Sequence, residues 1–233
     1  MPQDEDLPQG EDKAIIVERM FDQIAPRYDL VNRLMTFRMD VGWRRRTVRD
    51  LALTPGSTVL DFACGTGDFC NDLLRFELNP IGMDFSAGML AAAGTDAPLV
   101  RADALQLPVP SAHVDGVTCG FALRNFKDLT AFFHEVSRVV RPGGRIGLLD
   151  VGQPSNPFLR WGHSVYFGTV VPKIGALLSD PSAYRYLPKS VDYLPPSEEI
   201  LAELQKVGFT DAIRVPLSGG ITQLFLGTQV THN

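Results

Sequence analysis

The sequence is poor in the features that would indicate a disulfide framework, a metal centre or a membrane span. Its 233 residues contain three cysteines, at positions 64, 70 and 119, and no Cys-x-x-Cys pair. We therefore expect a reducing compartment and no metal site. No apolar run approaches the ~18–20 residues needed to span a bilayer. The opening "MPQDEDLPQGED" lacks the basic and then apolar segments of a leader and indicates a flexible tail over residues 1–11. We expect a cytoplasmic protein.

Excess positive charge is also missing. The chain has 22 Lys and Arg against 27 Asp and Glu, a net charge of −5. This balance argues against a nucleic-acid partner, and the basic run "WRRR" at 43–46 is more simply a solvated helix face. The hydrophobic content of 45% is enough to form the core of one domain with insertions.

The region 12–53 has helical rather than strand periodicity and predicts an N-terminal helical cap. One apolar stripe is formed by Ile15, Ile16, Met20, Phe21 and Ile24. Pro26 ends this helix or starts the next, and Asp40 is a plausible N-cap for a third helix through Leu53.

From Ser57 onward, short apolar runs alternate with helical segments. Strands are expected at 57–63, 79–86, 97–104, 113–120 and 145–151, with helices at 67–77, 87–93 and 128–140. This alternation predicts βαβ units and a parallel sheet covered on both faces. A further helix has Ser197 as its expected N-cap and Gly208 as its C-cap, and an antiparallel edge hairpin with a Ser-Gly-Gly turn follows.

We therefore predict a Rossmann-like α/β domain over 54–233, with a seven-stranded, mostly parallel sheet. The segment 152–195 interrupts the alternation and holds four of the five tyrosines, together with Phe158, Trp161 and Phe167. We expect it to form a lid insertion.

The strongest local motif is "VLDFACGTGDF" at 59–69. A strand ending in Asp61 runs through Gly65-Thr66-Gly67 into a helix. Glycines allow a ligand to approach the backbone, and the start of the helix offers free amides. Cys70 stands where a dinucleotide fingerprint has its third glycine, so this motif alone is weak evidence.

Two further acidic residues strengthen the motif. Asp84 ends the second strand, where a carboxylate can accept both hydroxyls of a ribose, and Asp103 follows the third strand, where it could accept from an adenine amino group. Together with Asp61 they form a cluster at the carboxyl edge of the sheet, where such folds bind ligands. Helix capping by each Asp is the competing interpretation.

This order of motifs resembles the class I S-adenosylmethionine-dependent methyltransferases. Four further blocks narrow the resemblance: "FDQIAPRYDLVNRLMTFRMDVGWRR", "FALRNFKD", "RVVRPGGRIGLLD" and "SDPSAYRYLPKSV". In this order they are similar to the ubiquinone/menaquinone biosynthesis C-methyltransferase family, from Met20 to Thr228.

The resemblance implies S-adenosyl-L-methionine as cofactor and assigns roles to individual residues. The cofactor-binding set is Asp61, Gly65, Thr66, Gly67, Asp84, Asp103, Ala104 and Gly120. Arg124 and Asn125 are the expected catalytic pair, and Tyr28, Asp29 and Asn32 are expected to shape the substrate site.

The chain departs from the family pattern at several positions. Thr36 stands where a serine is usual, and Asp40 where a histidine is frequent, so an imidazole is not available there. Asp150 and Gly152 occupy the places of a glutamate and a serine, and Ala122 that of a glycine. Gly152 removes a hydroxyl group.

The implied reaction is C-methylation of a prenylated quinol, with demethylmenaquinol favoured over a benzoquinol. Another small acceptor, or a cofactor-binding protein without catalysis, stays an alternative. An NAD-dependent oxidoreductase is disfavoured, because the glycine fingerprint is incomplete. The 152–195 lid suits a tunnel for an isoprenoid tail, peripheral contact with the inner face of the membrane, or helices simply packed on the core. A homodimer is also left open.

A guanidinium keeps its proton, with a pKa above about 12, so Arg124 cannot readily act as a base. We expect it to stabilise a developing phenolate or to orient a water that carries the proton away. Pairing with an acidic neighbour is the alternative. Trp43 is equally suited to core packing and substrate contact, whereas His163 and His134 are more simply structural or surface histidines.

Overall fold

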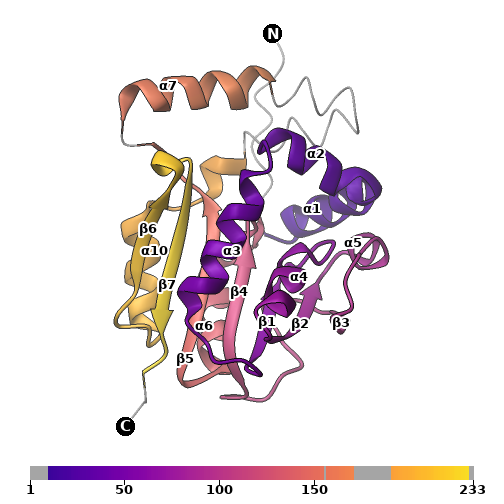
Figure 1. Ribbon diagram of the computed structural model, residues 1–233, viewed down its shortest axis with the longest axis vertical. Helices are drawn as coiled ribbons and strands as arrows, with labels where there is room; N and C mark the ends of the chain where they lie inside the picture. Colours follow the sequence, from indigo (N-terminus) through magenta and orange to yellow (C-terminus); the bar gives the residue numbers. More distant parts are fainter. Residues whose placement is uncertain (1–9, 155, 171–189, 231–233) are drawn as a thin grey trace.

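The computed structural model describes residues 10–154, 156–170 and 190–230. Its centre is a seven-stranded sheet of order β3-β2-β1-β4-β5-β7-β6 (Figure 1). The strands are β1 (Thr58–Phe62), β2 (Asn79–Asp84), β3 (Leu99–Arg101), β4 (Val114–Gly120), β5 (Val140–Val151), β6 (Ile213–Leu217) and β7 (Thr222–Thr228). The first five strands are parallel, while β7 is antiparallel to both β5 and β6. The predicted fold class, with its C-terminal edge hairpin, is confirmed.

Helices cover both faces of this sheet. The described helices are α1 (Gly10–Ile24), α2 (Tyr28–Met35), α3 (Met39–Leu51), α4 (Asp68–Arg75), α5 (Ala87–Ala91), α6 (Leu129–Val139), α7 (Pro157–Val165) and α10 (Ser197–Lys206). Short 3₁₀ turns occur at Ala25–Arg27, Leu123–Asn125, Val191–Tyr193 and Ser218–Gly220, and a π-helical turn at Tyr166–Val170.

Strand alternation divides the core between the two faces. On β1, Leu60 and Phe62 pack into a cluster with α6 and α10, whereas Val59 packs into a second cluster with α3 and α4. Leu148 and Leu149 on β5 divide in the same way. Successive side chains of a strand point to opposite faces, so each buried strand serves both clusters. The strands are therefore fixed from both sides, and their carboxyl ends form a rigid edge.

The N-terminal region is helical as expected, but its apolar stripe is only partly buried. Met20 and Ile24 are buried beside Met89 of α5, while Ile15 and Ile16 are 44% and 46% exposed. Contact with α5 and the adjoining turn covers only the end of α1 that contains Met20 and Ile24. Periodicity along a helix does not show where its neighbour ends.

Two expected helix caps are wrong. Asp40 is the second residue of α3, after Arg38 as N-cap, and its carboxylate instead contacts Thr36 and Arg44 inside the protein. Ser197 is the first helical residue of α10, after Pro196 as N-cap, and no side chain caps that end. In both places the residue type suited a cap, but the helix begins one or two residues earlier.

The division into tail, cap, core and lid stays a prediction. Residues 10 and 11 belong to α1, and most of the expected tail lies outside the described residues. The expected lid is described only at 152–154, 156–170 and 190–195, where α7 crosses one end of the molecule (Figure 1). None of the described helices has the length and apolar character needed to cross a membrane.

Candidate active site

A cavity of about 190 Å³ lies at the carboxyl edge of the sheet. Its lining comes from the ends of β1, β2, β3 and β4 and from α1. Among the residues expected to bind a cofactor, those that line it are Gly65, Asp84, Asp103, Ala104 and Gly120. We call it the cofactor cavity.

The glycine turn after β1 is bonded to the end of β2. Gly65 donates its amide N–H to Oδ2 of Asp84 over 2.8 Å. Gly67 has a left-handed φ of +84°, and a Cβ atom there would lie 2.6 Å from Cγ2 of Thr95. Both the backbone conformation and the contact with Thr95 therefore disfavour a side chain at Gly67.

Two carboxylates of the cavity wall retain free acceptor capacity. Asp84 accepts from the amides of Gly65 and Ser86, one at each oxygen. Burial raises the pKa of Asp84 against the opposing effect of these bonds. Asp103 accepts from the amide of Leu105 over 2.9 Å, and Nζ of Lys127 lies 3.9 Å away. Each carboxylate oxygen has a further lone pair for a ligand hydroxyl or amine.

Asp61, Thr66 and Gly67 do not line the cavity. Asp61 is 1% exposed and accepts from Oγ1 of Thr118 at 2.8 Å and from Sγ of Cys70 at 3.5 Å. It therefore links β1, β4 and α4 beneath the cavity. Burial raises the pKa of Asp61 to about 7.

A second, larger cavity of about 350 Å³ lies beside the first. Its lining is mainly apolar and aromatic and comes from α2, α3, α7 and the ends of β5 and β7. We call it the acceptor cavity. Tyr28 and Phe121 line both cavities, so the two spaces meet at these two rings. Phe121 has a left-handed φ of +60°, and its backbone N–H donates a hydrogen bond to the carbonyl of Leu149.

The expected catalytic pair is divided between the two cavities. Arg124 lines the acceptor cavity, and Asn125 lines the cofactor cavity. Arg124 is 7% exposed, with Nη1 2.5 Å from Oδ1 of Asp150 and Nε 3.0 Å from Oγ of Ser190. The ion pair weighed as an alternative is thus present, and Arg124 still forms part of the cavity wall. Oδ1 of Asn125 is buried and has no hydrogen-bond partner among the described residues.

The expected substrate residues are also divided. Tyr28 and Asn32, one turn apart on α2, line the acceptor cavity. Asp29 does not line it: its carboxylate accepts from the hydroxyl of Thr66, and Arg33 lies 3.7 Å away. Asp29 therefore joins α2 to the glycine turn.

The acceptor cavity also contains Thr36, noted from the sequence only as a departure from the family pattern, and Trp43, left open between core packing and substrate contact. Thr36 lines the acceptor cavity, four residues after Asn32, and this helical spacing could have identified it. Trp43 lines the same cavity, and its indole N–H donates to Oγ of Ser218 over 2.8 Å. His134 is exposed on α6, and the side chain of His163 lies outside the described residues.

The sheet order, the glycine turn and the acidic strand ends define a class I S-adenosylmethionine-dependent methyltransferase. A solved protein from Methanococcus maripaludis, proposed to be such an enzyme, is similar with a TM-score of 0.66 and 15% identity, covering 91% of this chain and 94% of that one. Phosphoethanolamine N-methyltransferase 2 from Haemonchus contortus, solved with S-adenosylmethionine, has a TM-score of 0.60 and 15% identity. That alignment covers 81% of this chain and about half, 52%, of the other. These likenesses concern the fold.

The chain belongs to the ubiE/COQ5 methyltransferase family, whose model matches residues 8–229. It is 42% identical to a demethylmenaquinone methyltransferase from Roseiflexus castenholzii, over 88% of this chain and 90% of the relative. It is 39% identical to a ubiquinone/menaquinone biosynthesis C-methyltransferase from Syntrophotalea carbinolica, over 89% of this chain and 92% of that relative. The resemblance expected from the motifs, the enzyme class and the cofactor are confirmed, while the roles of individual residues stay predictions.

The buried Asp61 predicts a specific pH dependence of stability. An unfolded Asp has a pKa of about 3.9, so the folded protein binds this proton more tightly, and stability falls as pH rises from about 4 to 7. Asp61→Asn removes this ionisation. Between pH 5 and pH 8 the unfolding free energy of the variant should gain about 2–3 kcal/mol relative to the wild type. Urea unfolding of both proteins measures it, and a difference that does not vary with pH would contradict the assignment.

Proposed function

We propose that this protein methylates a ring carbon of a prenylated quinol, converting demethylmenaquinol to menaquinol. The observation that carries the proposal is the meeting, at Tyr28 and Phe121, of a cavity that contains the carboxylates of Asp84 and Asp103 and a larger apolar, aromatic cavity. Two ligands placed in these cavities would face each other across that boundary. Such placement lowers the barrier to a two-substrate reaction, because the reacting atoms are already oriented.

The residues of the cofactor cavity fit S-adenosylmethionine. Asp84 suits the two ribose hydroxyls, and Asp103 with Ala104 suits the adenine edge. The buried Oδ1 of Asn125, which has no partner among the described residues, offers an acceptor for a ligand N–H group. Gly120 also lines the cavity, and a Cβ there would lie only 3.0 Å from the ring of Phe69, so the position has little room for a side chain. When bound, the cofactor supplies an electrophilic methyl group on a positively charged sulfur.

The acceptor cavity suits a flat ring with an apolar tail. Aromatic side chains, including Trp43 and Phe121, form part of its lining, and their ring centroids lie 6.1 Å apart. Phe158 and Leu159 of α7 line the same cavity and are 75% and 43% exposed, so they also reach the protein surface. A ring held near Trp43 could thus extend its tail towards the exterior.

Arg124 is placed to stabilise negative charge on the acceptor. The ring carbon becomes nucleophilic when a neighbouring hydroxyl is ionised, and a buried guanidinium in the cavity wall favours that anion. Asp150 and Ser190 fix the orientation of Arg124. The guanidinium retains its own protons, so this role needs a separate proton acceptor.

The naphthoquinol is preferred over a benzoquinol because of the relatives. Those from Roseiflexus castenholzii, Deinococcus radiodurans and Thermus thermophilus are named demethylmenaquinone methyltransferases. The benzoquinol and other small acceptors are the alternatives. A homodimer stays a prediction.

The function predicts binding and turnover that can be measured separately. Calorimetry should detect binding of S-adenosylmethionine to the protein and no binding of NAD. Anaerobic incubation with demethylmenaquinol should then give menaquinol, identified by mass, faster than the demethylated benzoquinol gives its product. Cofactor binding with no methylation of either quinol would refute the proposed substrate class and leave the cofactor assignment intact.

Replacing Arg124 should reduce turnover much more than cofactor affinity. Arg124→Gln removes the charge facing the acceptor, and kcat should fall by about 10²–10³-fold. Arg124→Lys keeps a positive charge but loses the planar guanidinium with its several N–H donors. Its kcat should therefore lie between those of the wild type and Arg124→Gln. The dissociation constant of S-adenosylmethionine should change by less than about threefold, because Arg124 lines only the acceptor cavity. Retention of near-normal kcat in Arg124→Gln would contradict the role.

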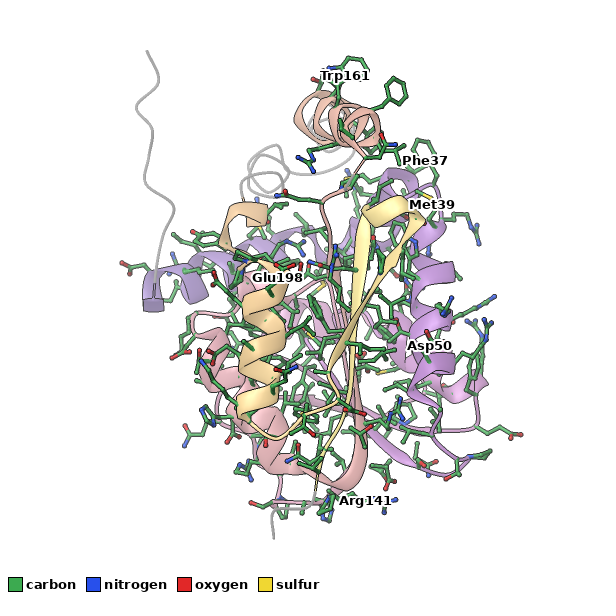
Figure 2. The ribbon with its side chains drawn as sticks, turned by 90° about the vertical axis from the view of Figure 1, so that its left-hand side faces the viewer. Phe37, Met39, Asp50, Arg141, Trp161 and Glu198 are labelled. Atoms are coloured by element: carbon green, nitrogen blue, oxygen red, sulfur yellow. The ribbon has the colours of Figure 1, made fainter. Side chains whose placement is uncertain are left out.

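We further propose peripheral membrane contact at the end of the molecule where α7 meets the α2–α3 corner. Phe37, Phe158 and Trp161 are 70%, 75% and 64% exposed. Figure 2 places Trp161, Phe37 and Met39 at one end, opposite Arg141. The segments 30–39 and 156–170 contain no Asp or Glu and carry three arginines. Arg33 pairs with Asp29 and Asp68, so the positive charge at this end comes from Arg38 and Arg160. This local charge is opposite to the net charge of the chain and suits an anionic bilayer.

Flotation with vesicles tests the membrane contact. The protein should float with vesicles containing anionic lipid, and binding should weaken at high salt. The triple change Phe37→Ser, Phe158→Ser and Trp161→Ser should abolish flotation. Phe76→Ser with Ile213→Ser, which removes exposed apolar side chains elsewhere, is the matched control. No flotation of the wild type at low salt would refute the contact.

A further inference from the structure

Among the described residues, none that lines the acceptor cavity is an ordinary base. The cavity's described lining residues include no Asp, Glu, His or Lys side chain. Ring methylation nevertheless requires a quinol hydroxyl to lose its proton. Arg124 can stabilise the resulting negative charge, but it cannot accept the proton. Within the described lining, a proton acceptor can act through a residue that both receives and donates a proton. Hydroxyl groups have this property.

Thr36 connects the cavity to a buried carboxylate. It lines the acceptor cavity, and its Oγ1 donates to Oδ1 of Asp40 over 2.5 Å. Asp40 is fully buried. Tyr28, Asn32 and Thr36 follow one another at four-residue spacing, and all three line the same cavity. The hydroxyl of Thr36 thus belongs to the wall against which the substrate would lie.

Asp40 belongs to a buried ionic cluster. Its Oδ2 lies 2.6 Å from Nη1 of Arg44. Arg44 also pairs with Asp68 at 3.1 Å and Asp72 at 3.0 Å, so one buried cation is shared by three carboxylates. Three further arginines at the cluster contact Asp68 or Asp72 and are 40–60% exposed: Arg33, Arg45 and Arg75. Oδ1 of Asp40 faces Thr36 and Oδ2 faces Arg44, so the oxygen that would take the proton is not the one in the ion pair.

The other buried carboxylate near the cavity is less suitable. Asp150 accepts from three N–H groups, those of Leu123, Arg124 and Val151. Its link to the cavity is the guanidinium of Arg124, which does not release a proton at neutral pH. Asp150 therefore orients charge, and the link through Thr36 differs from it in containing an exchangeable hydroxyl.

The backbone after Thr36 is held in an unfavourable conformation. Phe37 and Arg38 have φ values of 51° and 61°, and neither is glycine. Two backbone hydrogen bonds fix the turn: the N–H of Arg38 donates to the carbonyl of Arg33, and the N–H of Met39 donates to the carbonyl of Thr36. Strain of this kind persists where the surroundings require one geometry, and it is frequent at functional sites. Here the turn sets Thr36 against the first turn of α3, which carries Asp40.

We propose that Thr36 and Asp40 form the proton relay of this enzyme, with Thr36 as the catalytic residue and Asp40 acting through it. The quinol O–H bond breaks and its proton passes to Oγ1 of Thr36, whose own proton passes to Oδ1 of Asp40. The resulting quinolate carbon takes the methyl group. The proton on the methylated carbon is then lost to water, and the proton on Asp40 returns through Thr36 to the quinol oxygen. One proton is released in total. This inference rests on the proposed function.

Thr36→Val is the decisive variant, because it is nearly isosteric and leaves the ion pair of Asp40 and Arg44 in place. Turnover should fall by about 10²-fold or more, and Thr36→Ser, which restores a hydroxyl, should recover most of it. Thr228→Val is the matched control, since the hydroxyl of Thr228 also donates to a carboxylate, that of Asp211, at the far end of β7. It should leave kcat unchanged. Calorimetry with S-adenosylmethionine verifies that each variant is folded and binds the cofactor.

The pH profile separates proton transfer from positioning. A phenolic hydroxyl ionises unaided near pH 10. The deficit of Thr36→Val should therefore shrink by about tenfold per unit as pH rises from 7 to 9. Asp40→Asn should behave like Thr36→Val, and the double variant should be no slower than either. The pH dependence of wild-type turnover depends on all the charged groups that face Asp40. These are Arg44, Asp68 and Asp72, together with Arg33, Arg45 and Arg75.

The outcomes distinguish this inference from the proposed function. If the wild type does not methylate the quinol, the proposed function fails and the relay fails with it. If the wild type is active and Thr36→Val keeps more than about a third of its kcat, the relay alone is refuted. A large deficit that does not change with pH would also refute it, because a steric defect has no reason to follow ionisation of the acceptor.

Discussion

The buried guanidinium of Arg44 is the contact on which both cavities depend. It binds Asp40 within α3 and Asp68 and Asp72 on α4, and burial alone would lower its pKa, but these three carboxylates raise it. The N-terminus of α4 carries the glycine turn of the cofactor cavity, and α3 with α2 walls the acceptor cavity. One buried ionic cluster thus sets the position of the acceptor wall relative to the cofactor turn, and a buried charge with several partners tolerates little displacement.

The sheet and its acidic edge could be predicted because they follow from local patterns. Alternation of short apolar runs with helices indicates parallel strands, and parallel strands bring Asp61, Asp84 and Asp103 to one edge whatever the details of packing. Sequence could not show that Asp61 faces inward, beneath the cavity. Nor could it place Asp40, because a short acidic side chain near a helix start suits a cap as well as an ion pair, and only the approach of α4 decides between them.

The division of Arg124 and Asn125 between two cavities also has a local cause that the sequence leaves open. They lie in a 3₁₀ turn, Leu123–Asn125, where three residues complete each turn and neighbours diverge by about 120°. Adjacent residues can therefore serve different ligands. The rest of the acceptor wall comes from segments far apart in the chain: the indole of Trp43 is held by Ser218 from the hairpin, 175 residues away. Such a wall exists only once the fold has formed.

The two buried carboxylates beside the acceptor cavity differ in how they reach it, and this difference assigns their chemistry. Asp150 acts through a guanidinium, a group that carries charge and keeps its protons, so it can stabilise an anion already formed. Asp40 acts through a hydroxyl, a group that carries no charge and exchanges its proton, so it can help to form that anion. Loss of a proton and stabilisation of the charge left behind are separate requirements of the reaction. The described lining of the cavity has no titratable carboxylate or imidazole. Both requirements can still be met, because a different buried carboxylate behind the lining serves each one.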